Sequence, residues 1–352
     1  MTDTKRFFTD CLLTWNRLHN GRSMPWKGEK NPYKIWLSEI ILQQTRVEQG
    51  WPYYERFIEK YPVVHLLAAA PEEEVFRLWQ GLGYYARCKN MLAAAREIAG
   101  RFNGVFPSTY EGISSLKGIG AYTAAAIASF AFDLPFAVLD GNVYRVLARF
   151  FGIDTPTDST AGKKLFTQLA GEVLAKDQSA VYNQAIMDFG AVVCKPRQPL
   201  CTTCPLSTRC EAYNKGLTDL VPVKSKKLVI KKRYFHYLLL EQQGRIYIRK
   251  RREKDIWQNL HEFVLLETPA PATDAELLQS PAFRRILGKH PYKVVHSSAT
   301  IKQQLTHQTI HARFIRLSVT RAFPAPEGFL PVAPADLGQY AFPKIIVDFL
   351  QR

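Results

Sequence analysis

Apolar side chains recur every three or four positions through the first two-thirds of the chain, which is the spacing of amphipathic helices. Residues 33–45, 72–100 and 141–152 show this pattern most clearly. Prolines separate one helical stretch from the next, at positions 62, 71, 107, 135 and 156. The pattern predicts an all-α region over residues 1–216, with no repeat of fixed period.

The pattern changes after residue 216. A basic connector over residues 217–233 leads into short apolar stretches with a preference for β structure, at 245–251, 262–267, 293–301 and 312–323. Proline-rich segments separate several of these stretches. We therefore expect a smaller α+β domain over residues 234–352.

The charge balance favours a polyanionic partner. The 352 residues include 47 Lys and Arg against 31 Asp and Glu, a net charge of +16, and the length suits two or more domains. Nucleic acid is the leading partner, although a basic surface kept for solubility would give the same balance. The N-terminus shows no export signal and no apolar run reaches bilayer length, so we expect neither secretion nor membrane insertion.

The stretch LKGIGAYTAAAI, residues 116–127, places two glycines ahead of an alanine-rich helix. Gly118 and Gly120 permit positive φ and close backbone approach, and the following helix presents unpaired N–H groups. Together with the charge of Lys117, this arrangement predicts a binding site for a DNA phosphate. An ordinary helix–helix turn also uses glycines and is the alternative interpretation.

Two carboxylates are candidates for acid–base chemistry. Asp140 precedes a helix that begins near Asn142, where a capping carboxylate accepts backbone hydrogen bonds and keeps a lowered pKa. Glu39 lies on a largely apolar helix face, where burial would raise its pKa and hold its proton near neutral pH. Two acids with opposite pKa shifts form the pair that cleaves glycosidic bonds, whereas a plain N-cap and a solvent-facing Glu are the structural alternatives.

Four of the six cysteines form the pattern C-x6-C-x2-C-x5-C, at Cys194, Cys201, Cys204 and Cys210. Four thiolates in a short loop predict a metal site, and a disulfide framework does not suit a chain without an export signal. Structural zinc sites commonly use two CxxC pairs and this loop has one. The spacing therefore favours an iron–sulfur cluster and leaves zinc as the alternative.

A resemblance to the helix-hairpin-helix DNA glycosylases of the endonuclease III superfamily rests on LKGIGAYT, LDGNV and the cysteine loop. The chain is more closely similar to the adenine DNA glycosylases of the MutY type, which remove adenine mispaired with 8-oxoguanine, through PWKGEKNPYKIWLSEIILQQTRV, GLGYYAR and the added C-terminal domain. The resemblance implies a helix-hairpin-helix glycosylase fold over 1–216, with a six-helix module and a 4Fe–4S cluster in the loop 194–210. It also implies a basic linker over 217–233 and a Nudix-like domain that recognises 8-oxoguanine over 234–352.

The same resemblance implies roles for individual residues. Glu39 would be the general acid that protonates N7 of an everted adenine, and Asp140 would stabilise the oxocarbenium ion at C1′ or add to it covalently before water does. Bifunctional relatives have a nucleophilic lysine where this chain has Tyr122, so a monofunctional enzyme is expected. The other matched residues assist at the transition state (Tyr122, Asn142), line the adenine pocket (Arg22, Trp26, Lys27, Gln184) or lie beside the estranged 8-oxoguanine (Gln44, Thr45, Leu82, Tyr84).

In the C-terminal domain, Leu305-Thr306-His307 stands where the family has Phe-Ser-His, so a hydroxyl is kept and an aromatic ring is lost. The Nudix hydrolase signature is missing from the sequence, and no pyrophosphatase activity is expected. The implied partner is duplex DNA with adenine opposite 8-oxoguanine or G, bound by a monomer, and for a bacterial protein the implied location is the cytoplasm with its nucleoid. An endonuclease III-like glycosylase/lyase acting on oxidised pyrimidines and a non-catalytic DNA-binding module are the alternative functions.

Overall fold

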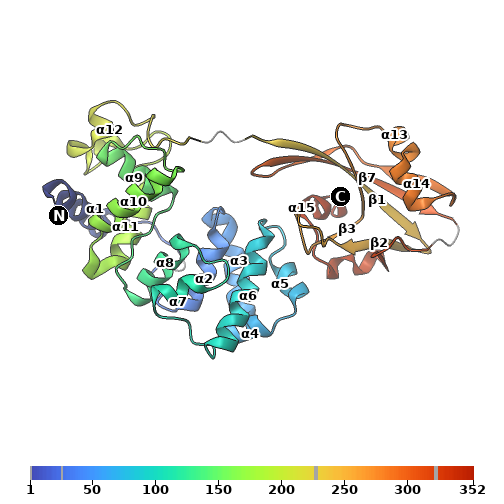
Figure 1. The fold of residues 1–352 in the computed structure, drawn as a ribbon, viewed down its shortest axis with the longest axis horizontal. Coiled ribbons are helices and arrows are strands. Elements are labelled where there is room, and N and C mark those ends of the chain that lie inside the picture. The colour runs from blue at the N-terminus through green and yellow to red at the C-terminus, as the bar shows by residue number, and fades with distance from the viewer. Residues whose placement is uncertain (1, 25–26, 226–228, 321–323) are drawn as a thin grey trace. The chain divides into compact units, whose positions relative to one another are not determined.

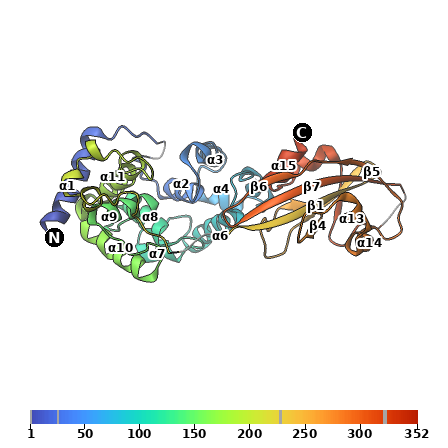
Figure 2. The same ribbon diagram turned by 90° about the horizontal axis from the view of Figure 1, so that it is seen from above.

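The computed structural model describes residues 2–24, 27–225, 229–320 and 324–352. Two compact units make up the chain, one from Met1–Ala69 with Asn90–Lys227 and the other from Ala70–Lys89 with Leu228–Arg352. The first unit is helical and the second is a sheet with helices (Figure 1, Figure 2). The expected fold class, an all-α region followed by an α+β region, is confirmed.

The first unit consists of helices and short 3-10 turns. Its elements are α1 (Asp3–His19), α2 (Pro32–Leu42), α3 (Val47–Lys60), α4 (Val64–Ala69), α7 (Tyr110–Ser115), α8 (Ala121–Phe132), α9 (Gly141–Phe151), α10 (Thr160–Val173), η1 (Lys176–Gln178), α11 (Ser179–Val192), η2 (Cys201–Thr203), η3 (Ser207–Arg209) and α12 (Glu211–Asn214). Helix α6 (Tyr85–Arg101) starts in the residues of the second unit and continues in the first. Among the described helices none is long and apolar enough to cross a membrane.

Helix α8 is at the centre of the first unit. Every residue from Thr123 to Ser129 is buried, and most of them are alanines. Small side chains let neighbouring helices approach closely, and α2, α7 and α11 all contact α8. An apolar cluster that includes Phe8, Phe150 and Phe189 joins α1, α9 and α11 with buried alanines of α8. This packing fixes α2 and α9, which carry Glu39 and Asp140, in one framework.

The turn between α7 and α8 requires one of its two glycines. Gly118 has φ +79°, and a Cβ there would lie 2.6 Å from the Asn90 Cβ, so both backbone conformation and space exclude a larger residue. Gly120 has φ −91° and open space where a Cβ would stand, so the turn does not depend on it in the same way. The expectation that both glycines supply positive φ therefore holds only for Gly118.

The helical pattern over 72–100 is broken in the structure. Helix α5 (Glu72–Leu78) ends before α6 begins, and Gly81, Gly83 and Tyr84 between them have φ of +95°, +78° and +49°. Trp79 is buried and donates from Nε1 to the Gly83 carbonyl at 2.9 Å. Apolar residues continue through this turn with helical spacing because they face a core, so periodicity alone does not reveal the break.

The second unit contains an eight-stranded sheet with the order β3-β2-β1-β7-β5, to which β4, β6 and β8 add beside β1, β7 and β2. Strands β1 and β7 pair in parallel and the other pairs are antiparallel. The elements are α5, β1 (Lys231–Gln242), β2 (Arg245–Lys250), β3 (His261–Glu262), β4 (Val264–Thr268), α13 (Asp274–Gln279), α14 (Pro281–Leu287), β5 (Tyr292–Ser297), β6 (Ile301–Gln304), β7 (Gln308–Val319), β8 (Leu330–Val332), η4 (Pro334–Gln339) and α15 (Lys344–Leu350).

Both faces of the sheet are covered by helices. Leu238 and Leu240 of β1 pack with residues of α13 and α14, and Phe314 of β7 stacks on Phe349 of α15 with ring centroids 4.0 Å apart. Each strand expected at 262–267 and 293–301 is split in two by a short irregular segment. Of the strand expected at 312–323, residues 321–323 lie outside the described residues.

Residues 70–89 belong to the second unit because of polar contacts with its strands and C-terminal segment. Lys250 pairs with Glu73 at 2.6 Å and with Glu72 at 3.4 Å, and the Phe342 amide donates to Gln80 Oε1 at 3.2 Å. The sequence pattern places this stretch in the helical region, whereas the compact unit that contains it is built mainly from strands.

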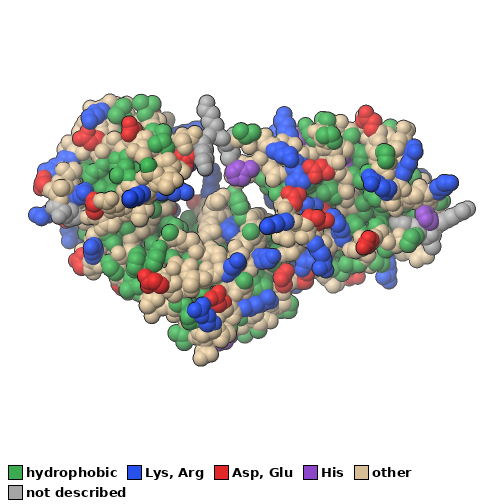
Figure 3. All heavy atoms as spheres, in the orientation of Figure 1, with side chains coloured by type: hydrophobic (Ala, Val, Ile, Leu, Met, Phe, Trp, Pro, Cys, Tyr) green, Lys and Arg blue, Asp and Glu red, His purple; other side chains and the backbone are tan. Residues whose placement is uncertain are grey.

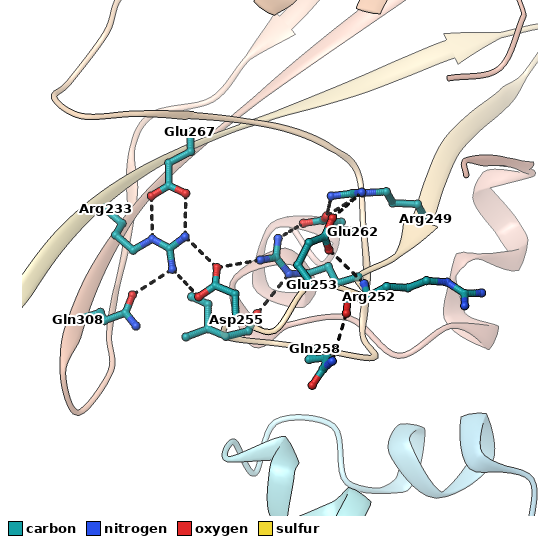
Figure 4. A network of polar contacts seen from close by, with 11 residues as sticks. Arg233, Arg249, Arg252, Glu253, Asp255, Gln258, Glu262, Glu267 and Gln308 are labelled. Carbon is teal, nitrogen blue, oxygen red and sulfur yellow. Dashed lines mark hydrogen bonds and ion pairs between the residues drawn. The ribbon is translucent and has the colours of Figure 1, made fainter. Parts of the chain in front are cut away.

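A network of ions, some fully buried and others exposed, joins the strands of the second unit (Figure 4). Arg233 of β1 binds Glu267 and Asp255, each through two hydrogen bonds, and also donates to Gln308 at the start of β7. Glu262 of β3 is fully buried and accepts from Arg249 at 2.9 Å and from the buried Arg251. Since a buried carboxylate is stable only when it is paired, this network makes the strand arrangement specific.

Removing one arginine from this network tests its contribution. Arg251→Met should lower the free energy of unfolding by about 3 kcal/mol, because Glu262 keeps only Arg249 in a buried position. Urea unfolding of the whole chain measures the loss. The control Lys344→Met breaks an exposed pair with Asp348 and should change the value by less than about 0.5 kcal/mol. Equal effects of the two substitutions would contradict the role given to the network.

Candidate active site

A cavity of about 820 Å³ in the first unit brings together residues that lie far apart in the sequence. Its lining comes from the α2–α3 connection, the α7–α8 turn, the start of α9 and one face of α11, among other segments. The lining includes these residues selected from the sequence: Arg22, Glu39, Gln44, Thr45, Gly118, Gly120, Tyr122, Asp140, Asn142 and Gln184. Met24, Gln43, Phe130 and Met187, which the sequence did not single out, line it as well.

Glu39 is held inside α2 with only 8% of its surface exposed. Asn31 caps this helix by accepting from the amides of Tyr33 and Lys34, and the helix is buried on nearly all sides. Burial raises the pKa of Glu39 to about 7, the negative charge of Asp140 raises it further, and the hydrogen bond from Tyr122 lowers it. The solvent-facing alternative is therefore wrong, and the carboxyl is poised to hold a proton near neutral pH.

Asp140 is the N-cap of α9. Its Oδ1 accepts from the Val143 amide at 2.8 Å, and its Oδ2 accepts from Asn142 Nδ2 at 2.7 Å. The sequence predicted a lowered pKa, but the pKa of Asp140 is raised, because burial outweighs the hydrogen bonds from Val143 and Asn142 and the charge of Arg145. Asp140 therefore caps α9 and also lines the cavity. The pKa values of Glu39 and Asp140 are both raised, whereas the sequence predicted opposite shifts.

Tyr122 stands at the mouth of α8, where its hydroxyl donates to the Glu39 carboxylate. Burial and the charges of Glu39 and Asp140 raise the pKa of this phenol well above its usual range, so it remains a donor at any physiological pH. The Tyr122 side chain interacts with both carboxyls, and it carries a hydroxyl instead of an amine. The residue that follows the hairpin therefore orients the Glu39 carboxyl and offers no primary amine to the cavity.

Arg145 fixes the start of α9 through hydrogen bonds to Asn142 and to two backbone carbonyls. Its Nη2 donates to Asn142 Oδ1 at 2.8 Å and to the Gly190 carbonyl at 2.7 Å, and its Nε donates to the Cys194 carbonyl at 2.7 Å. A Cβ on Gly190 would lie 2.7 Å from the Asn142 Cβ, so α11 can approach this closely only through glycine. Asn142 is thereby held with its amide nitrogen toward Asp140.

Of the four residues expected around an adenine, two line the cavity. Arg22 and Gln184 line it, and Gln184 Nε2 is buried without a hydrogen-bond partner among the described residues. Lys27 is not part of the lining, since its Nζ donates to the Arg22 carbonyl at 2.9 Å and pairs with Asp188 at 3.4 Å. Trp26 lies outside the described residues.

The residues expected beside 8-oxoguanine divide between the two units. Gln44 and Thr45 line the cavity of the first unit, and Gln44 has φ +56°, a conformation that costs about 1–3 kcal/mol outside glycine. In the second unit, Tyr84 also has positive φ, and its hydroxyl is hydrogen-bonded to that of Thr306. This contact joins the GLGYY turn to the Leu305-Thr306-His307 turn within one unit.

Two more residues of these turns have structural contacts. Leu82 is buried, with 4% of its surface exposed. His307 is exposed, and its carbonyl accepts from the Lys231 amide at 3.0 Å, which anchors the turn to the first residue of β1. At the hairpin, Lys117 is exposed and α8 begins without a side-chain cap, so its first amides are open to a ligand.

The four cysteines of the C-x6-C-x2-C-x5-C pattern line one small cavity of about 30 Å³, together with Arg149. Arg149 is buried and donates from Nη1 to Cys194 Sγ at 3.5 Å and to the Lys195 carbonyl at 2.7 Å. Within the part of the chain that the structure describes, no three His, Cys, Asp or Glu side chains already stand in metal-binding geometry. The thiols nevertheless share one cavity and form no disulfide, so the donor set fits a thiolate-ligated metal group.

Residues 37–169 match the HhH-GPD superfamily base excision DNA repair proteins, and residues 236–352 match the NUDIX domain family. The adenine DNA glycosylase of Buchnera aphidicola subsp. Baizongia pistaciae (strain Bp) is 38% identical over 261 residues, which cover 74% of this chain and 74% of that protein. The adenine DNA glycosylase of Mus musculus is 39% identical over 217 residues, which cover 59% of this chain and 42% of the mouse protein.

Solved structures agree with the helical fold of the first unit. The structure of a thermostable thymine-DNA glycosylase is 29% identical, has a TM-score of 0.56 and matches 60% of this chain and 97% of its own. An endonuclease III–DNA covalent intermediate, 22% identical with a TM-score of 0.53, matches 62% of this chain and 99% of its own and shares the fold. Because the bacterial relative is similar along most of both chains and the HhH-GPD and NUDIX regions follow in order, this chain belongs to the adenine DNA glycosylase family.

Proposed function

We propose that this protein hydrolyses the N-glycosidic bond of adenine mispaired with 8-oxoguanine or G in duplex DNA, and that it leaves the DNA strand intact. The observation that carries the proposal is the placement of Glu39 and Asp140 in one cavity with the Tyr122 phenol, and without a lysine among the lining residues. An acid that holds a proton near pH 7 beside a second carboxyl is the equipment for cleavage of a glycosidic bond.

The reaction follows from these groups. Glu39 gives its proton to N7 of the everted adenine, so that the base departs without a negative charge. The ionised Asp140, held by Val143 and Asn142, stabilises the positive charge that develops at C1′. Water then adds to C1′ and releases a proton to the vacated carboxylate of Glu39. Tyr122 keeps the Glu39 carboxyl in place, and the described residues that line the cavity include no lysine to form a Schiff base.

Recognition of the substrate involves both units. The hairpin with Lys117, Gly118 and Gly120 is proposed to bind a DNA phosphate, since α8 presents open amides there. The net charge of +16 supports binding to a polyanion, and Lys and Arg side chains are spread over both units on the face shown in Figure 3. We propose that a monomer binds the duplex.

The adenine and lesion contacts complete the proposal. Arg22 and Gln184, with Trp26 and Lys27 nearby in the sequence, are proposed to recognise adenine. The residues proposed to contact the 8-oxoguanine side of the mispair are Gln44, Thr45, Leu82, Tyr84, Thr306 and His307. The Tyr84–Thr306 hydrogen bond supports a joint action of the last two turns, because it places their hydroxyls together. The boundaries 1–216, 217–233 and 234–352 stay the predicted limits of the functional domains.

We propose that Cys194, Cys201, Cys204 and Cys210 hold a 4Fe–4S cluster. The shared cavity and the absence of disulfides among these described cysteines support this assignment. When bound, such a cluster ties four points of the loop together through Fe–S bonds. Arg149 and Arg145 hold the first cysteine from the α9 side through Sγ and the carbonyl.

Replacement of the general acid tests the central claim. Glu39→Gln should lower the single-turnover rate of adenine release by about 10²–10⁴-fold, while binding of the duplex changes little, because the amide keeps the shape and has no proton to give. Release from a duplex with adenine opposite 8-oxoguanine is measured after alkali treatment. The matched control is Glu48→Gln, an exposed residue of the same cavity, which should leave the rate unchanged.

Two outcomes of that assay would contradict the proposal. Unchanged turnover in Glu39→Gln would leave both carboxylates with structural roles only. A strand nick without alkali, or an adduct trapped by borohydride, would favour a glycosylase/lyase that forms a Schiff base.

The pH dependence of the rate is a second test. Because the protonated form of Glu39 is required and burial raises its pKa to about 7, the single-turnover rate should fall as pH rises above about 7, approaching tenfold per pH unit. Asp140 must be ionised, so the rate should also fall on the acidic side, at a pH above the usual range of an aspartate because its pKa is raised. A rate that stays constant from about pH 6 to pH 9 would be incompatible with Glu39 as the acid.

The metal assignment is tested on the purified protein. It should be brown with absorbance near about 400 nm and contain about four Fe per chain, since thiolate-to-iron charge transfer colours such clusters. Cys204→Ser should lower the iron content, whereas Cys88→Ser, which alters a buried cysteine outside the loop, should retain it. A colourless protein with bound zinc would refute the cluster.

A further inference from the structure

Asp188 of α11 is a fully buried carboxylate to which neither the catalytic proposal nor the sequence analysis gives a role. Its Oδ1 accepts from Arg22 Nη1 at 2.7 Å, and its Oδ2 accepts from Asn20 Nδ2 at 2.9 Å and Lys27 Nζ at 3.4 Å. All three donors come from the connection between α1 and α2. A buried carboxylate without partners strongly destabilises the folded protein, so the contacts of Asp188 hold this connection against α11.

The connection depends on these contacts for its shape. Helix α1 ends at His19 and α2 begins at Pro32, and between them the described residues form neither helix nor strand. The Arg22 amide donates to Asn20 Oδ1 at 3.1 Å, and Lys27 Nζ donates to the Arg22 carbonyl at 2.9 Å. The three residues that bind Asp188 are thus also bound to one another, and they close a compact polar cluster around its carboxylate.

The cluster borders the cavity through Arg22. Gln184 and Met187, one turn and one residue before Asp188 on α11, line the cavity, and so do Arg22 and Met24 from the connection. Asp188 itself is not a lining residue. For the Arg22 guanidinium, only Nη1 has a hydrogen-bond partner within the described ranges, which leaves Nε and Nη2 to donate to an acceptor of the everted nucleotide.

We propose that Asp188 is a positioning residue. Its carboxylate holds the Arg22 guanidinium at the cavity wall, near Gln184, which lies on the same helix as Asp188. The inference rests on the proposed adenine glycosylase function, because it assigns Arg22 to substrate binding. Asp188 does not touch the substrate. Asp188 affects the reaction through Arg22. The guanidinium is planar, so the bond from Nη1 to Asp188 also fixes the direction in which Nε and Nη2 point.

A double-mutant cycle tests this route. Asp188→Asn keeps the size of the side chain but removes the charge that holds Arg22, and it should lower the single-turnover rate at saturating enzyme by about 10–100-fold. Arg22→Met should lower the rate at least as much. The double variant should be no slower than Arg22→Met alone, because a residue that acts through Arg22 has nothing left to position. Multiplying losses in the double variant would overturn the proposal.

The matched control is Asp133→Asn. Asp133 pairs with Lys30 of the same connection at 2.9 Å, but both side chains are exposed and neither lines the cavity. This variant should keep the wild-type rate. Hydrogen exchange of residues 20–31 should become faster in Asp188→Asn than in Asp133→Asn, and equal protection in the two variants would show that Asp188 does not hold the connection.

Two further readouts separate the possible failures. The alkaline limb that Glu39 gives to the pH profile should be unchanged in Asp188→Asn, whereas a shifted limb would show damage to the acid itself and overturn a role through Arg22. If Asp188→Asn does not fold, Asn20→Ala removes the amide that donates to Asp188 Oδ2 at 2.9 Å and should slow the reaction by about 3–10-fold, and an unchanged rate would overturn the proposal. A wild-type protein that releases no adenine would overturn the proposed function, while hydrogen exchange would still decide whether Asp188 holds the connection.

Discussion

The burial of two carboxyl groups in one cavity is the constraint on which the site depends. Burial raises the pKa of Glu39 and that of Asp140, and the negative charge of Asp140 raises the pKa of Glu39 further, so the pair is stable only with nearby hydrogen-bond donors. Tyr122 serves Glu39, and the Val143 amide and Asn142 serve Asp140. The donors to the two groups differ: a phenol serves Glu39, whereas a backbone amide and a side-chain amide serve Asp140.

The framework around the pair is built from the requirements of helix packing. The alanines of α8 let α2 and α11 come close, and Gly190 lets α11 reach the start of α9. Arg145 then links Asn142, Gly190 and Cys194 through hydrogen bonds, so the cap of α9 and the beginning of the cysteine loop share one buried guanidinium. A small displacement of α11 would therefore move Asp140, the cysteine loop and the connection that carries Arg22.

The second unit uses a different stabilising device. Its parallel pair of β1 and β7 is held at one end by Arg233, which binds two carboxylates and Gln308, close to the Leu305-Thr306-His307 turn. Tyr84 meets Thr306 from the α5–α6 turn. Thus a segment from the early part of the chain and a turn from its last part meet through a hydrogen bond, in a unit where ion pairs act beside the apolar packing of the sheet.

Sequence alone determined the local features of this protein. Helical spacing predicted α2 and α9, and the cysteine spacing predicted the cysteine loop. The sequence also has a tyrosine, and not a lysine, after the hairpin. Each of these features is encoded within a few neighbouring residues. Tertiary structure decided what depends on distant neighbours. The direction of the Asp140 pKa shift, the union of residues 70–89 with the strands and the contact of Asp188 with Arg22 and Lys27 all arise from burial or from pairing across more than a hundred positions. No local pattern specifies such contacts, since their energy comes from desolvation and charge pairing that exist only once the chain has folded.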